Sequence, residues 1–400
     1  MATVPSRVSL VTTPHLRSAD GLEAGRRVTW LELFFDLVFV AAVAQVGTHL
    51  QADYSLAGVL RFSVLFVLIW WAWLGHTSYS TRFDTDDVVQ RGLTGLQMFL
   101  AIVMAINATG ALDSRDSAGF AAAYSVMRLV LVAQYWRVRH LAQARALTAP
   151  LAWGCAVAAM MWLASAFVEA PARFWIWGAA LAVDVLTPLL ATRQLIRVPH
   201  DAAHLPERYG LFSIILLGES VVAVMNGMQS QEYWSPWAAS AAILGLALLF
   251  VIWWWYFDGV DAASERFVRT SRDALRFHVW SYAHLPLYLG IAVTGVGLEH
   301  VITTATAAPL HAPEAWILAG AVTALMLALT AISTTSHRHT RGTRATRHRR
   351  AWLLSLAPLA LGAAGTSVMP AVVVAGFLGL SLAQLWLALA DRHARLKLGA

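Results

Sequence analysis

Two carboxylates lie four residues apart in the first long apolar stretch of the chain. Glu32 and Asp36 belong to segment 30–40, which reads WLELFFDLVFV. On a helix this spacing places both side chains on one face. An acid inside a membrane span is costly, so the pair marks a candidate site for a proton, a cation or a substrate.

Other ionisable residues are expected inside apolar segments further along the chain. They are Arg128, Asp184, Glu219 and His284. With Glu32 and Asp36 they suggest a polar cluster between two halves of the protein, in which Arg128 is the counter-ion of an unidentified acid. Burial favours a neutral carboxyl group and a nearby guanidinium favours the charged one, so such groups can be tuned to titrate. A buried ion-pair network that only fixes helix packing is the alternative interpretation.

A second group of acids follows the second apolar segment, in the sequence RFDTDD. It contains Arg82, Asp84, Asp86 and Asp87. Three acids in four residues could hold a divalent cation through oxygen ligands. They could instead cap the next helix, because an acid at a helix start accepts backbone N–H bonds. An ion-pair latch with Arg82 or Arg266 is the third possibility.

The composition determines which solvent surrounds these residues. The chain has 400 residues, of which 58% are hydrophobic and only 13% are charged, with a mean hydropathy of +0.59. Soluble domains carry about 25% charged residues. The sequence therefore predicts an all-α polytopic membrane protein whose main partner is the lipid bilayer.

A helix needs about 20 mostly apolar residues to cross the hydrocarbon core. Applying this length to the sequence predicts about twelve transmembrane helices. They are expected at 30–50, 57–77, 88–109, 118–136, 150–168, 173–192, 208–228, 236–257, 276–298, 314–334, 350–367 and 370–390.

The distribution of basic residues predicts the orientation. With the N-terminus in the cytoplasm, 25 of the 29 Lys and Arg fall on the cytoplasmic side and three on the other. This bias predicts a cytoplasmic-membrane protein with both termini inside. The most basic stretch, 337–350, is expected to be a cytoplasmic loop near anionic headgroups. It lacks interleaved aromatic residues, so it does not predict nucleic-acid binding.

An internal repeat is suggested by similar residues in two apolar segments. Residues 69–71 and 252–254 read IWW at an offset of 183, and the same offset places Asp36 on Glu219. We predict a cytoplasmic tail at 1–28 and two parallel six-helix halves at 29–200 and 201–400.

Four sequence blocks resemble the bacterial low temperature requirement protein A family. The blocks are 28–39, 82–87, 207–220 and 282–286, and they follow the family's order. The resemblance implies a multi-pass cytoplasmic-membrane protein. The family name describes growth in the cold, and it supplies no substrate, catalytic residue or cofactor.

Three functions are compatible with these residues. The leading hypothesis is a secondary transporter or ion-coupled carrier for a small molecule or an ion. An integral-membrane enzyme acting on a lipid or isoprenoid through the acids at 84–87 is the alternative, so enzymatic activity stays open. The third is a structural or signalling role in cold growth. No P-loop, dinucleotide fingerprint or zinc-ligand spacing is present, so no cofactor or metal is predicted, and the oligomeric state stays open.

Overall fold

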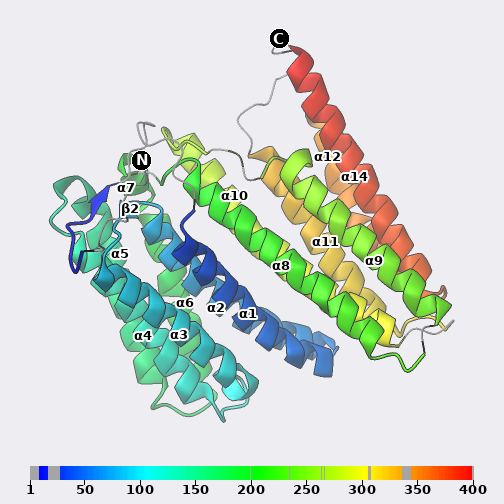
Figure 1. The fold of residues 1–400 in the computed structure, drawn as a ribbon, viewed down its shortest axis with the longest axis horizontal. Helices are drawn as coiled ribbons and strands as arrows, with labels where there is room; N and C mark the ends of the chain where they lie inside the picture. Colours follow the sequence, from blue (N-terminus) through cyan, green and yellow to red (C-terminus); the bar gives the residue numbers. More distant parts are fainter. Residues whose placement is uncertain are drawn as a thin grey trace, which may run out of the picture. The chain divides into compact units, whose positions relative to one another are not determined.

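The protein is described by a computed structural model that covers residues 9–16, 28–198, 200–233, 235–262, 264, 266–304, 308–335 and 344–398. It is built from helices and one short antiparallel strand pair (Figure 1). The helices are α1 (Trp30–Ala52), α2 (Leu56–Ser80), α3 (Val88–Ala111), α4 (Ser117–Arg137), α5 (Ala142–Ser165), α6 (Ala172–Leu190), α7 (Thr192–Arg197), α8 (His204–Gln229), α9 (Pro236–Trp254), the π-helix η1 (Trp255–Gly259), α10 (Ser271–Thr303), α11 (Ala312–Thr334), α12 (Arg344–Leu356), α13 (Pro358–Ala364) and α14 (Pro370–Leu398).

The helices confirm the predicted class. Among the described residues, eleven helical segments are long and apolar enough to cross a membrane. Ten of them begin and end within a few residues of the predicted spans, and the expected span at 150–168 begins earlier, at Ala142. The fold is therefore that of an all-α polytopic membrane protein.

The count departs from twelve at one place. The expected span 350–367 consists of two short helices, α12 and α13, which meet around Ala357. Pro358 is the first residue of α13. Proline has no amide hydrogen, so Pro358 cannot donate the backbone hydrogen bond that would continue α12. Residues 344–350 of the predicted basic loop belong to α12, and 337–343 lie outside the described residues.

The chain forms two compact units, which we call the first and the second unit. The first comprises residues 1–46, 67–208 and 265–274. Within it, α3, α4, α5 and α6 pack in sequence order. An apolar core around Tyr79, Leu131 and Leu147 joins α2, α4 and α5.

The second unit comprises residues 47–66, 209–264 and 275–400. Here α9 packs along α14, and α11 packs against α12 and α13 (Figure 1). A cluster of buried rings from α8 and α10 includes Tyr209, Trp280, His284 and Tyr288.

Strands β1 (His15–Leu16) and β2 (Phe83–Asp84) pair antiparallel, with His15 opposite Asp84 and Leu16 opposite Phe83. The pair ties part of the predicted N-terminal tail, residues 9–16, to the connection between α2 and α3. The remaining residues of that tail, up to 27, lie outside the described part of the chain.

Candidate functional site

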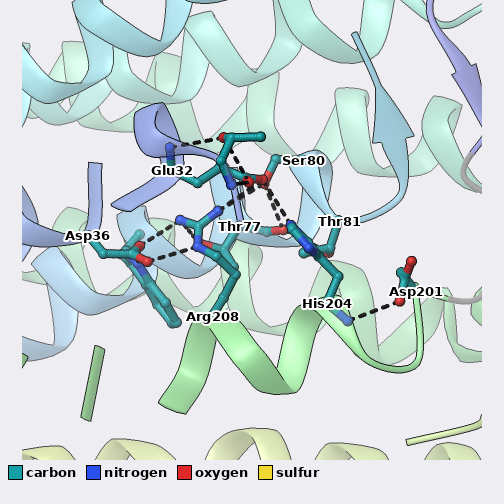
Figure 2. Close-up of polar contacts among 10 residues, drawn as sticks. Glu32, Asp36, Thr77, Ser80, Thr81, Asp201, His204 and Arg208 are labelled. Atoms are coloured by element: carbon teal, nitrogen blue, oxygen red, sulfur yellow. Dashed lines mark hydrogen bonds and ion pairs between the residues drawn. The ribbon is translucent and has the colours of Figure 1, made fainter. Parts of the chain in front are cut away.

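Arg208 lies at the centre of a buried ion-pair network in the first unit (Figure 2). Its Nε donates to Oδ2 of Asp36 at 2.8 Å, and its Nη2 donates to Oδ1 at 2.6 Å. Trp73 donates its indole N–H to the same Oδ1 at 2.6 Å. Asp36 and Arg208 are both 0% exposed. A two-pronged pair of this kind fixes both side chains, because the planar guanidinium matches the carboxylate.

Glu32 uses its two carboxylate oxygens for different partners. Oε2 accepts from the backbone N and the hydroxyl of Thr29, at 2.9 and 3.0 Å. This contact forms a capping box at the start of α1. Oε1 lies 3.0 Å from Nε2 of His204 and 3.4 Å from Nη1 of Arg208. Asp201 accepts from the backbone N of His204 at 2.9 Å, which fixes the first turn of α8 (Figure 2).

The charges of this network do not cancel in every protonation state. It contains two carboxylates, one guanidinium and one imidazole. With a neutral imidazole the formal charge is minus one, and with a protonated imidazole or a protonated Glu32 it is zero.

A cleft of about 570 Å³ in the first unit reaches Glu32. It is lined by the residues that begin α1, the end of α2, the connection that follows and the start of α3. Asp84 and Asp86 line it together with Glu32. The structure thus brings the acidic connection and one of the span carboxylates to one cavity. In the sequence, these two groups lie in different segments, about 50 residues apart.

Each of the three acids in that connection has its own partner. Asp87 is the N-cap of α3 and accepts from the backbone N of Gln90 at 2.7 Å. Asp86 pairs with Arg91 at 2.8 Å, and Asp84 lies 3.7 Å from His15. The capping role of Asp87 is therefore confirmed. Among the described residues, no group of three or more His, Cys, Asp or Glu side chains is arranged to hold a metal ion.

The pKa of Asp87 is lowered in the folded protein. Burial acts to raise it, but the backbone N–H groups of Thr12 and Gln90 and the guanidinium of Arg137 outweigh that effect. Thr12 donates its N–H to Oδ2 at 2.7 Å, and Arg137 donates to the same oxygen at 2.6 Å. Asp87 therefore joins the N-terminal segment, α3 and α4.

Arg82 binds groups other than the three acids. Its guanidinium donates to the carbonyl oxygens of Ser78 and Val198 at 3.0 and 3.3 Å, and Nη2 lies 3.1 Å from Nδ1 of His200. Burial lowers the pKa of Arg82 to about 10. These contacts fasten the segment after α7 to the end of α2.

Arg128 pairs with Asp184 rather than with Glu32 or Asp36. Its Nε lies 3.2 Å from Oδ2 of Asp184, and both side chains are 2% exposed. Nη2 donates to the hydroxyl of Tyr124 at 2.6 Å. A Cβ atom on Gly75 would lie only 2.9 Å from Nη1, so the glycine lets the guanidinium lie against α2. This pair is therefore separate from the Arg208 network.

Glu219 and His284 belong to the second unit. Both nitrogens of His284 contact neutral groups, the hydroxyl of Tyr256 at 3.0 Å and the carbonyl oxygen of Trp280 at 2.7 Å. Glu219 is partly exposed on α8. Its surroundings thus differ from those of Asp36, and the suggested joint role of Asp36 and Glu219 stays a prediction.

Several residues of the network are missing from the sequence-based set. Arg208 and His204 are absent because they stand at a helix start, where a basic residue normally indicates the membrane interface. Trp73 is absent because an indole in an apolar run normally indicates packing. The only signal for Arg208 was its place in the block 207–220, which resembles the family pattern.

The fold and the buried network define a polytopic membrane protein with charged groups inside its spans. The chain belongs to the family described as bacterial low temperature requirement A protein (LtrA), which it matches over residues 27–389. It is also similar to the uncharacterized protein RA0937 of Rhizobium meliloti (strain 1021), with 32% identity in an alignment of 288 positions that covers 68% of each chain. The Arg208 network and the cleft lie within the range that the family match covers.

Proposed function

We propose that the protein is a secondary transporter of the cytoplasmic membrane, with a proton- or cation-linked site in its first unit. One observation carries this proposal: the cleft leads to Glu32, a carboxylate that shares Arg208 with a second, fully buried carboxylate. A structural ion pair needs one acid for each guanidinium. The additional acid, next to an imidazole, can take up a proton or a cation from the cleft.

The contacts support different roles for the two acids, Asp36 and Glu32. Asp36 makes the two short contacts to Arg208 and is 0% exposed, so it holds the guanidinium in place. Glu32 lies 3.4 Å from Arg208 and lines the cleft. Protonation of Glu32 removes its attraction to Arg208 and His204, which loosens the start of α1 from the start of α8. This step links proton binding to a movement of helices.

Flux in proteoliposomes tests the coupling. Purified protein is reconstituted, a pH gradient is imposed, and pools of small solutes are added while current is recorded on a solid-supported membrane. We expect a solute-dependent current that the Glu32→Gln variant loses. Glu232→Gln is the matched control, because Glu232 is an exposed acid outside the spans. Equal, pH-independent currents in the wild type and Glu32→Gln contradict the proposal.

The proposed orientation, with the N-terminus inside, has its own test. Cys155 is the only cysteine of the chain, so a Cys155→Ser background allows single-cysteine labelling. A membrane-impermeant thiol reagent applied to intact cells is expected to label Ser114→Cys, between α3 and α4. It is not expected to label His140→Cys, between α4 and α5. The opposite labelling pattern reverses the topology.

A lipid-modifying enzyme is the second candidate, because Asp84 and Asp86 line the cleft that reaches Glu32. This function requires Mg²⁺-dependent turnover of an added lipid that Asp86→Ala abolishes. Turnover that persists in chelator excludes the metal-dependent form. A purely structural role predicts that Glu32→Gln and Asp36→Asn still support growth in the cold.

A further inference from the structure

The outward side of α12 changes from basic to apolar along the helix. Arg349 and Arg350 are exposed near its middle. Leu353 and Leu356 follow closer to its end and are 58% and 46% exposed. Trp352, which is 38% exposed, lies between the two groups in the sequence. The change from charged to apolar surface therefore takes place within about two helical turns.

Contacts on the inner side of α12 fix which residues point outward. Ser355 is fully buried, and its hydroxyl lies 2.9 Å from that of Thr330 on α11. Gln384 on α14 donates to the carbonyl oxygen of Ala351 at 2.7 Å and to the Ser355 hydroxyl at 3.0 Å. Both neighbouring helices belong to the second unit, as α12 does. Packing therefore sets the rotation of α12 about its own axis.

The outward residues form one stripe that continues from α12 onto α13. Its exposed members recur at intervals of three or four residues, which is the spacing of one helix face. They are Arg349, Leu353, Leu356 and Ala360. On the other side, Gly362 is buried, and a Cβ atom there would lie 2.7 Å from Ala319 on α11. The stripe is thus the side that α11 does not cover.

The basic end of this stripe carries charge that the described residues do not neutralise. Neither Arg349 nor Arg350 has an ion pair or a side-chain hydrogen bond within the described part of the chain. The planar guanidinium group matches the oxygens of a phosphate. Tryptophan is enriched where the apolar core of a bilayer meets the headgroups. The order of cation, indole and apolar side chains is therefore that of headgroup, interface and acyl chain in a phospholipid.

We infer that the stripe of α12 and α13 is a binding site for an anionic phospholipid of the membrane. Arg349 and Arg350 bind the phosphate, and an acyl chain lies along Leu353 and Leu356. A zwitterionic lipid has the same chains but no net negative charge, so it gains less from the arginines. One basic residue near an anionic membrane surface contributes about fivefold in affinity. The site belongs to the second unit and does not depend on the proposed transport.

Lipid titration of the purified full-length protein in detergent tests this inference. Dioleoylphosphatidylglycerol is the anionic probe, and dioleoylphosphatidylcholine is the zwitterionic one. The melting temperature reports binding, because a ligand of the folded state stabilises it. We expect the anionic lipid to raise the melting temperature at a concentration at least tenfold lower than the zwitterionic lipid. Equal responses to the two lipids overturn the inference.

A matched pair of double variants separates a site from general attraction by charge. The test variant combines Arg349→Gln with Arg350→Gln, and the control combines Arg145→Gln with Arg193→Gln. All four side chains are exposed, so both variants lose two surface charges and are expected to fold. We expect the apparent affinity for the anionic lipid to fall at least tenfold in the test variant and less than threefold in the control. Equal losses overturn the inference, because net charge alone then attracts the lipid.

Two further probes distinguish a lipid from a free anion. Inorganic phosphate has the charge without an acyl chain, and dihexanoylphosphatidylglycerol has the headgroup with short chains. We expect no shift of the melting temperature with phosphate and an apparent affinity at least fivefold weaker for the short-chain lipid. A shift with phosphate that Arg349→Gln removes identifies an anion site and overturns the lipid inference. Equal affinities for the short-chain and long-chain lipids also overturn it, because Leu353 and Leu356 then contribute nothing.

Discussion

Replacing Arg208 by Met is the sharpest test of the buried network. The change removes the guanidinium that contacts both Asp36 and Glu32 and leaves two carboxylates in the span. Arg208 and Asp36 have side-chain exposures of 0%, so solvent does not screen the loss. Breaking a buried ion pair by removing one partner costs about 3–5 kcal/mol. We expect Arg208→Met to lose at least this much stability.

Two companion variants separate charge from geometry. Arg208→Lys keeps the positive charge but not the paired contacts of 2.6 and 2.8 Å to Asp36, so it is expected to lose about 1.5–3 kcal/mol. The double variant Arg208→Met with Asp36→Asn removes one buried charge of each sign. It is expected to be more stable than the sum of the single changes by about 1–3 kcal/mol.

The assay is reversible unfolding in mixed micelles with increasing fractions of a denaturing detergent, followed by circular dichroism. Arg91→Met is the control, because Arg91 pairs with Asp86 where the side chains are 48% and 55% exposed. Such a pair is worth about 0–1 kcal/mol. The reasoning is refuted if Arg208→Met costs no more than Arg91→Met, or if the two changes in the double variant are additive.

Three further predictions follow from other contacts. The folded-state contacts lower the pKa of Asp87 from its ordinary 3.8, so the ionised Asp87 stabilises the protein fully above pH 3.8 and this stabilisation is lost as the pH falls through the lowered pKa. Asp87→Asn should therefore make the melting temperature depend less on pH between about pH 5 and pH 3. An unchanged slope of melting temperature against pH contradicts this prediction. Gly75→Ala places a Cβ 2.9 Å from Nη1 of Arg128 and should lower the free energy of unfolding by about 1–3 kcal/mol in the same assay. Gly92→Ala is the control, because a Cβ there meets no atom within 4 Å, and it should leave the stability unchanged or raise it. His284→Leu removes the imidazole that contacts the Tyr256 hydroxyl and the Trp280 carbonyl oxygen, and it should lower the free energy of unfolding by about 2–4 kcal/mol. It should leave the pH dependence of transport unchanged. A shifted pH profile of transport would give His284 a role in coupling.

The spans were predictable from the sequence because each one needs a long apolar run, and such runs are rare by chance. Local composition decides whether about 20 residues are stable in lipid, whatever their neighbours are. The exception is instructive. The stretch 350–367 is apolar enough overall, but Pro358 at its centre starts a new helix, and a hydropathy window does not register that break.

The sequence predicted some residues of the site but did not predict which of them contact one another. Glu32 and Asp36 stand out because acids are costly in a span. Their partner Arg208 lies 172 residues away from Asp36 in the sequence. Because Arg208 lies near a helix start, its position resembles that of a basic residue at the membrane interface. Pairing across helices is a property of packing, and packing is not periodic in sequence.

The distance between Asp36 and Arg208 along the chain also affects how the protein is made. Glu32 and Asp36 enter the membrane with the first span, and Arg208 is synthesised 172 residues after Asp36. At about 5–20 residues per second, the ribosome needs roughly 9–34 s to reach it. During that interval both acids must stay protonated, hydrated or in contact with the insertion machinery. The buried pair between α1 and α8 can therefore form only after α8 has been synthesised.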